Sequence, residues 1–97
     1  MKFEYNLEKS ETNRRKHGIT LEEAKGLWAA PNVQLEANVA GELRFMIIGK
    51  LNHKFYSCIF TPREEKIRLI SARRSRPKEE RIYHENISQE EIDSEGI

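Results

Sequence analysis

The strongest constraint on the fold is a change of hydrophobic period near residue 33. Before it, apolar side chains recur at helical spacing, and after it they alternate with polar side chains, as in β-strands. The strand-like segments that follow are residues 33–39, 43–48, 55–60 and 66–72. Only short turns separate them, and short turns join neighbouring strands that run in opposite directions. The pattern therefore predicts an antiparallel meander.

Helical segments and one more strand surround this meander. A short first strand is predicted at Phe3 and Tyr5, which alternate with charged residues. A polar helix follows over residues 7–17, and a second helix begins at the N-cap Thr20. Pro77 is suited to the first turn of a helix after the last strand. The predicted fold class is α+β, in the order β-α-α-β-β-β-β-α, with the two N-terminal helices on one face of the sheet and a C-terminal helix at its end.

The charge distribution divides the chain into a domain and a tail. Its 97 residues suffice for one domain with a small core, predicted over residues 1–84. Residues 85–97 hold acidic but no basic side chains and predict an acidic C-terminal tail. The body without this tail carries a net charge of about +6, concentrated between Arg63 and Arg81. Clustered basic side chains favour a polyanionic partner. A solvated, salt-bridged surface is the alternative.

Several function classes are disfavoured. No apolar run approaches the roughly 18 residues of a membrane span, and the N-terminus lacks a secretion signal. The single cysteine, Cys58, predicts a buried inert thiol and no disulfide framework. A cytoplasmic protein without a membrane partner is therefore expected. His17, His53 and His84 lie on separate elements without ligand spacing, so neither a metal site nor a cofactor is expected.

The end of the last strand carries the side chains best suited to bind phosphate. Arg73 and Arg74 end this strand, Arg76 follows, and a helix begins at Pro77. Guanidinium groups beside a helix N-terminus predict an anion site. These three arginines in four positions have too few nearby acidic residues in the sequence to pair with. Arg63 is expected at the opposite end of the strand, roughly 20–25 Å away, a distance that several nucleotides of RNA would span.

Cleavage of RNA without a metal ion needs a base, a cation and an acid. Arginine can act only as the cation, because it stays protonated. The candidates for the base are Glu80, Glu42 and the histidines, and Tyr83 could donate a proton or stack on a nucleobase. The alternatives are a solvated helix face for Glu80, ring packing for Tyr83 and a helix-dipole interaction for His17.

The predicted site residues form two sets. The catalytic candidates are Arg63, Arg73, Arg74, Glu80 and Tyr83. The predicted RNA-binding residues are Lys16, His17, Arg44, Arg68, Arg76 and Arg81.

Short motifs along most of the chain resemble those of BrnT-type toxins. In the N-terminal half they are Phe3-x-Tyr5, Lys9, Asn13, Lys16-His17-Gly18-Ile19, Glu23-Ala24 and Pro31. In the C-terminal half they are Arg44, Gly49, Arg63, Arg68-x-Ile70-Ser71-Ala72-Arg73, Glu80 and Tyr83. Their order is consistent from Met1 to about Tyr83, and Asn6 stands where the family usually has Asp.

The resemblance implies a RelE-like fold and a ribonuclease toxin of a type II toxin–antitoxin system that halts translation. RNA is then the substrate. The implied partner is a cognate antitoxin, usually a ribbon-helix-helix DNA-binding protein, so a hetero-oligomer is expected and DNA is contacted only through the antitoxin. The leading hypothesis is a metal-independent endoribonuclease. The alternatives are a non-catalytic RNA-binding or regulatory module, and a decayed toxin that retains only antitoxin binding.

Overall fold

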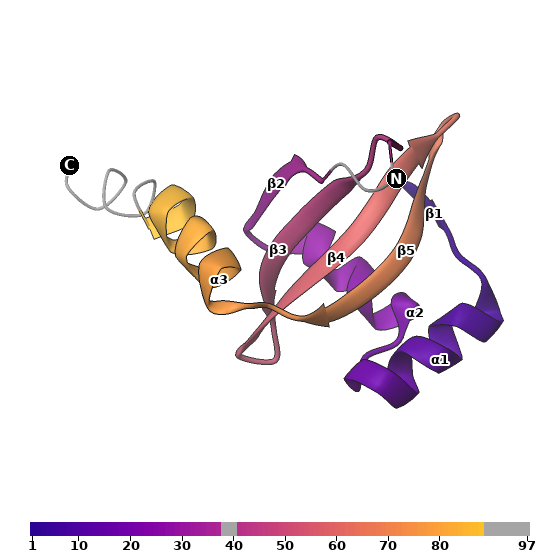
Figure 1. The fold of residues 1–97 in the computed structure, drawn as a ribbon, viewed down its shortest axis with the longest axis horizontal. Helices are drawn as coiled ribbons and strands as arrows, with labels where there is room; N and C mark the ends of the chain where they lie inside the picture. The colour runs from indigo at the N-terminus through magenta and orange to yellow at the C-terminus, as the bar shows by residue number, and fades with distance from the viewer. Residues whose placement is uncertain (38–40, 89–97) are drawn as a thin grey trace.

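A five-stranded sheet forms the centre of the fold in a computed structural model, which describes residues 1–37 and 41–88 (Figure 1). The strands are β1 (Lys2–Glu4), β2 (Asn32–Glu36), β3 (Phe45–Leu51), β4 (Lys54–Arg63) and β5 (Lys66–Arg74), and they lie in the order β1-β5-β4-β3-β2. Strands β2 to β5 pair antiparallel, as the short turns predict. Strand β1 instead pairs parallel with β5. The predicted α+β class is confirmed, but the sheet is mixed rather than wholly antiparallel.

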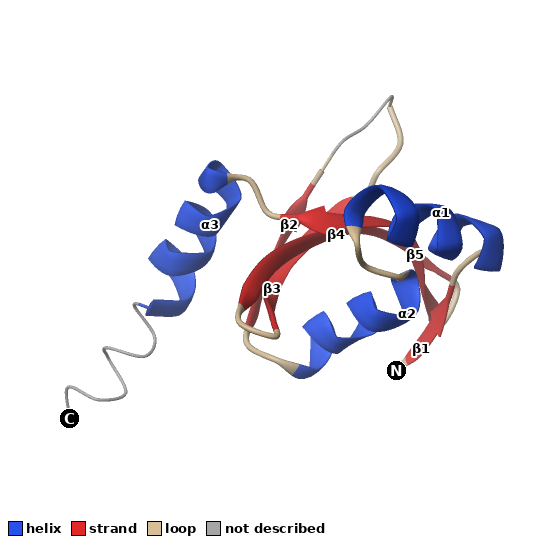
Figure 2. Cartoon of the chain, turned by 90° about the horizontal axis from the view of Figure 1, so that it is seen from below, coloured by secondary structure: helices blue, strands red, loops and turns tan. Residues whose placement is uncertain are grey.

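The helices lie on the two faces of this sheet. They are α1 (Leu7–His17), α2 (Leu21–Ala24) with its 3-10 continuation η1 (Lys25–Ala29), and α3 (Pro77–Tyr83) with its π-helical continuation η2 (His84–Ser88). Figure 2 shows α3 standing well apart from α1 and α2. None of the helices in the described part of the chain is long and apolar enough to cross a membrane.

Local capping fixes the ends of the first two helices where the sequence predicts them. The Asn6 side chain accepts a hydrogen bond from the Lys9 backbone N–H at 3.0 Å, which caps the start of α1. Gly18 ends this helix with a φ of 74°, a conformation that glycine adopts without strain. Thr20 and Glu23 form a reciprocal capping box at α2.

Two apolar clusters, one on each face, hold the layers together. Ile47 and Ile48 are neighbours on β3, so their side chains enter opposite clusters. The larger cluster lies under α2 and η1 and contains Ile19, Leu21, Ala24, Leu27, Ile47, Cys58, Phe60, Leu69 and Ala72. The smaller cluster lies under α3 and η2 and contains Ile48, Tyr83 and Ile87. Cys58 is buried as predicted, and burial raises the pKa of its thiol to about 12, which leaves it unreactive.

Asn13 fastens α1 to the edge of β5. Its side-chain amide donates to the carbonyl oxygens of Ala72 and Ile19, both at 2.8 Å, and its side-chain oxygen accepts from the Ala72 N–H at 3.1 Å. Strand β1 covers the edge of β5 only at residues 66–68, so the edge at Ala72 has no strand beside it. Because Asn13 is buried, its hydrogen bonds take the place of water there. The position of α1 along β5 is thereby fixed.

Some element boundaries differ from the predicted ones. Strand β4 continues through Pro62. A proline is tolerated there because β3 begins opposite Phe60 and does not extend beside Pro62. The helix after β5 continues past residue 84 to Ser88, because Ile87 packs into the smaller cluster. The rest of the predicted tail and residues 38–40 lie outside the described residues, and the domain boundary at 84 stays a prediction.

Candidate functional site

Several elements meet at one end of the sheet and make it basic. Strand β5 ends at Arg74, which lies opposite Tyr56 near the start of β4. The β3–β4 turn and the start of α3 lie there too, and Gly18 after α1 lines a small cavity together with Tyr56. The basic side chains of this region, called the basic end below, are Lys16, His17, Lys50, His53, Lys54, Arg73, Arg74 and Arg76.

Arg73 at the basic end is bound to a carboxylate of the same chain. Its two terminal nitrogens donate to the two oxygens of Glu79, each at 2.8 Å, in a bidentate ion pair. The Arg73 side chain is 25% exposed and that of Glu79 only 10%. One of the three clustered arginines is therefore paired, with a carboxylate that lies across the strand–helix junction, six residues along the chain.

Glu79 also fills the anion site that the sequence predicts at the start of α3. Its Oε1 accepts from the Arg76 backbone N–H at 2.9 Å and from the Ser57 hydroxyl at 2.8 Å, and Ser57 in turn contacts the Ser75 hydroxyl. Burial alone raises the pKa of Glu79, but Arg73, the Arg76 N–H and Ser57 outweigh burial and lower it to about 2. The site does bind an anion, and that anion is the chain's own ionised carboxylate.

Arg74, the last residue of β5, is exposed. Its side chain lies over the Tyr56 ring, with the guanidinium carbon 5.7 Å from the ring centroid. Its Nε donates to the Phe55 carbonyl oxygen at 3.3 Å. Within residues 1–37 and 41–88, Arg74 has no carboxylate partner. It is exposed and held in place, which are the properties required of a phosphate contact.

The three predicted residues of α3 have different surroundings. Glu80 is partly exposed and Arg81 is exposed. Tyr83 is only 7% exposed, and its ring packs edge-on against that of Phe55 with centroids 5.0 Å apart. The Tyr83 ring is therefore packed inside the protein, as the alternative to a catalytic role described.

The remaining predicted residues lie at the other end of the sheet. Arg63 pairs in register with Lys66 at the start of β5, so it is separated from Arg73 by about seven residues of strand, roughly 23 Å. Arg44 forms an ion pair with Glu42 at 2.8 Å, and Arg68 lies 3.7 Å from Glu4. The structure thus places Arg63 opposite the basic end, as predicted, and does not bring Arg44 or Arg68 to that end.

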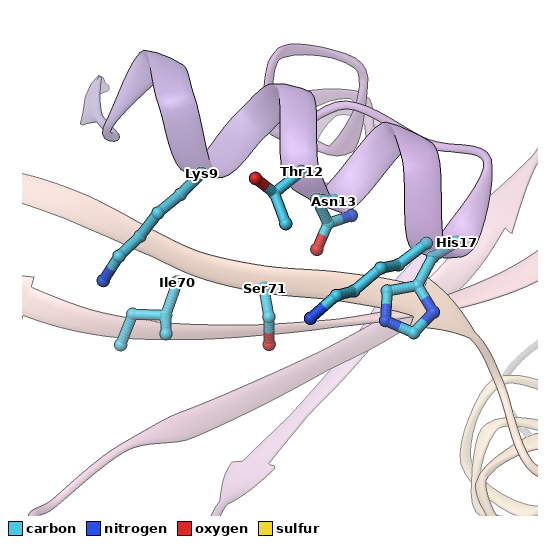
Figure 3. Close-up of a pocket in the computed structure, with 7 residues that line it drawn as sticks. Lys9, Thr12, Asn13, His17, Ile70 and Ser71 are labelled. Atoms are coloured by element: carbon cyan, nitrogen blue, oxygen red, sulfur yellow. The ribbon is translucent and has the colours of Figure 1, made fainter.

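A groove of about 280 Å³ runs between α1 and β5, beside the basic end (Figure 3). Its lining residues are Lys9, Thr12, Asn13, Lys16, His17, Ile70 and Ser71. Figure 3 shows Lys9 and His17 reaching from α1 toward β5, with Thr12 between them. Lys16 and His17 are therefore brought together with polar side chains that the sequence analysis did not assign to the site.

The sequence held signals for these missed residues. Positions 9, 12, 13 and 16 follow the i, i+3, i+4, i+7 spacing of one helix face. Glu79 occupies the third position of the helix that Pro77 opens, where a carboxylate commonly bonds back to the N-cap. Nothing in the local sequence indicates that Ser71 lines this groove. Within the described residues, no group of three His, Cys, Asp or Glu side chains could hold a metal ion.

The mixed sheet, the helices on its two faces and the basic end define a small α+β protein, an architecture consistent with a RelE-like fold. The family model described as the ribonuclease toxin BrnT of type II toxin–antitoxin systems matches residues 5–79. That span is most of the chain, so the protein belongs to the BrnT family, and the resemblance found in its motifs is confirmed. A comparison with curated proteins finds no match.

Proposed function

We propose that this chain is an endoribonuclease toxin that cleaves RNA at its basic end without a metal ion and thereby inhibits translation. The observation that carries the proposal is Arg74, an exposed guanidinium fixed over Tyr56 with no carboxylate partner among the described residues. Around it, the basic end adds the cations that a polyanionic substrate requires. Family membership supplies the general activity, that of a ribonuclease toxin.

The proposed reaction uses the RNA's own 2′-hydroxyl as the nucleophile. A base removes the hydroxyl proton, the 2′-oxygen bonds to phosphorus, and the bond from phosphorus to the 5′-oxygen breaks. An acid protonates that leaving oxygen, so the products carry a 2′,3′-cyclic phosphate and a 5′-hydroxyl. Arg74 and Arg76 stabilise the charge on the phosphoryl oxygens. Arg73 contributes the N–H groups that Glu79 leaves unused, and Arg63 holds a phosphate farther along the strand.

The proton-transfer candidates are His17, Glu80 and Tyr83. His17 is exposed in the groove, and Glu80 is partly exposed on the first turns of α3, so both are accessible to substrate. Tyr83 is tested by Tyr83→Phe, which preserves the ring packing against Phe55 and removes only the hydroxyl.

The remaining basic side chains are proposed to extend the RNA-binding surface. Lys16 flanks the groove and Arg81 is exposed on α3. Arg44 and Arg68, at the other end of the sheet, would contact RNA only after separating from Glu42 and Glu4. Both pairs are at least partly exposed, and solvent-accessible pairs cost little to break.

The proposed partner is a cognate antitoxin, a small ribbon-helix-helix DNA-binding protein that forms a hetero-oligomer with the toxin in the cytoplasm. An acidic antitoxin segment over the basic end would compete with RNA for the same charges. DNA would then be contacted only through the antitoxin.

The proposal is tested by incubating purified protein with RNA in excess EDTA. Cleavage that continues in EDTA and leaves 2′,3′-cyclic phosphate ends supports it. Cleavage that requires added Mg²⁺ contradicts the mechanism. Binding without cleavage under both conditions would favour the non-catalytic RNA-binding module instead.

A further inference from the structure

A cavity of about 210 Å³ lies at the basic end, on the face of the sheet that carries the larger apolar cluster. Its lining residues are Gly18, Ile19, Glu23, Leu51, Asn52 and Tyr56. Ile19 belongs to that cluster, and the side chains of Leu51 and Tyr56 pack against it. These three residues therefore give the cavity apolar walls that the core holds in place.

Two polar side chains of this cavity have unused hydrogen-bonding atoms. The Oε1 atom of Glu23 accepts from the backbone N–H and the hydroxyl of Thr20, at 3.0 and 3.1 Å. Glu23 Oε2 and the Asn52 amide form no hydrogen bond within residues 1–37 and 41–88. Both residues are exposed. The capping box thus fixes one carboxylate oxygen and leaves the other available to a ligand.

The β3–β4 turn fixes the backbone that carries Asn52. Leu51 and Lys54 pair in register, so the turn contains only Asn52 and His53. These two residues have positive φ values of 51° and 67°, as in the tight hairpin turn that matches the twist of paired strands. The position of Asn52 beside the cavity is therefore set by the hairpin itself.

The cavity adjoins Arg74, the proposed phosphate contact. Arg74 and Tyr56 pair across β5 and β4, so their side chains lie on the same face of the sheet. The Arg74 guanidinium carbon lies 5.7 Å from the centroid of the Tyr56 ring, and Tyr56 lines the cavity. An RNA strand whose phosphate meets Arg74 therefore has the base of the same or the next nucleotide within reach of the cavity.

The size and charge of the cavity favour a neutral ring system. Its volume lies below the roughly 300–1,000 Å³ of small-molecule pockets, so it suits a single base rather than a whole nucleotide. The Glu23 carboxylate repels phosphate, and the cations of the basic end repel a cationic side chain. A nucleobase is uncharged and combines apolar faces with a polar edge.

The available hydrogen-bonding atoms decide which base fits. A carboxylate accepts from an exocyclic amino group, such as N4 of cytosine. Uracil presents a carbonyl oxygen at the same position, and that oxygen repels the carboxylate. The Asn52 amide can donate to the ring nitrogen beside the amino group, which is an acceptor in cytosine and a donor in uracil. Glu23 and Asn52 therefore both favour cytosine over uracil.

We propose that this cavity is a base subsite that takes an amino-bearing nucleobase through Glu23 and Asn52 and rejects uracil. The inference rests on RNA being the substrate, as proposed above. Arg74 holds a phosphate, which carries no sequence information, so the cavity supplies a base preference that the basic end alone lacks. Cytosine is the smallest amino-bearing base and is therefore the probe for this subsite.

The test compares two 2′-O-methyl homopolymers of equal length, one of cytosine and one of uracil. Neither strand has a free 2′-hydroxyl, so the proposed reaction cannot cleave them, and each presents the same base in every register. The Kd of each strand is measured by fluorescence anisotropy at neutral pH. We expect wild-type protein to bind the cytosine strand about tenfold more tightly, the effect of one hydrogen bond to a charged group.

The variant Glu23→Gln identifies the group responsible. Glutamine preserves the capping box, because its side-chain oxygen still accepts from Thr20, and an amide NH2 then stands where Glu23 has Oε2. The tenfold preference should therefore disappear. Glu22→Gln is the matched control, because it removes the same charge from the neighbouring residue of α2, which does not line the cavity. This control should keep the preference.

A second variant, Asn52→Gly, keeps the turn because glycine adopts a φ of 51° without strain. It removes one neutral hydrogen bond and should reduce the preference for cytosine to about threefold. Circular dichroism confirms that each variant is folded.

Equal Kd values of the two strands for wild-type protein overturn the inference. A preference that persists in folded Glu23→Gln, or that Glu22→Gln removes as fully, overturns it too. Failure of the proposed function is distinguishable, because that function is measured as cleavage of all-ribose RNA. Cleavage without a cytosine preference leaves the nuclease proposal standing. A Glu23-dependent preference in a protein that cleaves no RNA leaves the subsite standing and removes the nuclease.

Discussion

Replacing Glu79 by glutamine tests how the basic end is held together. The substitution keeps the size of the side chain but removes the charge that Arg73 contacts through both terminal nitrogens. In the folded protein the pKa of Glu79 falls from its ordinary 4.5 to about 2. A difference of that size corresponds to roughly 3 kcal/mol of folding free energy at neutral pH. We therefore expect Glu79→Gln to lower the free energy of unfolding by about 3 kcal/mol at pH 7.

The sign of the pH dependence follows from the lowered pKa. The ionised form of Glu79 is favoured in the folded state, so its contribution is complete above pH 4.5 and is lost as the pH falls toward 2. The wild-type protein should lose stability over this range, whereas Glu79→Gln should lack that component. The two should therefore approach one another near pH 2.

Urea unfolding followed by tryptophan fluorescence measures this difference. Trp28 is the only tryptophan and packs between Phe3 and Phe60, so its emission reports on the core. Glu85→Gln is the matched control, because Glu85 is exposed on the continuation of the same helix. A Glu79→Gln variant as stable as wild type at pH 7, or with the same loss of stability between pH 4.5 and 2, would refute the reasoning.

Three further predictions concern the fold and the tail. Asn13→Ala should lower the free energy of unfolding by about 3 kcal/mol, because it removes three buried hydrogen bonds, and an unchanged urea midpoint would contradict this. Arg73→Ala should abolish toxicity and also lower the free energy of unfolding by roughly 3–5 kcal/mol, because it leaves buried Glu79 unpaired. Lost toxicity with unchanged thermal unfolding would instead show that Arg73 acts only on the substrate. Removing residues 89–97, which carry four acidic side chains, should strengthen RNA binding at low salt and matter less at high salt. Equal RNA affinity with and without these residues at both ionic strengths would exclude autoinhibition by the tail.

Much of the fold could be predicted because it depends on local signals. The caps at Asn6, Gly18 and Thr20 and the helix start at Pro77 each involve residues within a few positions of one another. The antiparallel meander follows from short turns between alternating segments. The parallel pairing of β1 with β5 could not be predicted in the same way, because it joins residues more than sixty positions apart and leaves no local pattern.

The candidate site was predicted less completely, for a related reason. The sequence predicted an anion site at the junction of β5 and α3, but not that Glu79 would occupy it. That contact requires the strand to end and the helix to turn back so that the side chains of Arg73 and Glu79 meet. The groove likewise depends on Asn13 placing α1 against β5, a contact between residues 59 positions apart. Only its α1 wall could be predicted from helical spacing.

The most direct test of the central claim is the rate of RNA cleavage by Arg74→Ala in EDTA. Its matched control is Arg14→Ala, which removes the same charge from an exposed pair with Glu11 outside the basic end. If Arg74 stabilises the phosphoryl charge, single-turnover cleavage should fall by about 10²–10³-fold, as it does when one transition-state donor is removed. The control should cleave at close to the wild-type rate. A folded Arg74→Ala variant that cleaves as fast as Arg14→Ala would contradict the assignment of the active site to the basic end.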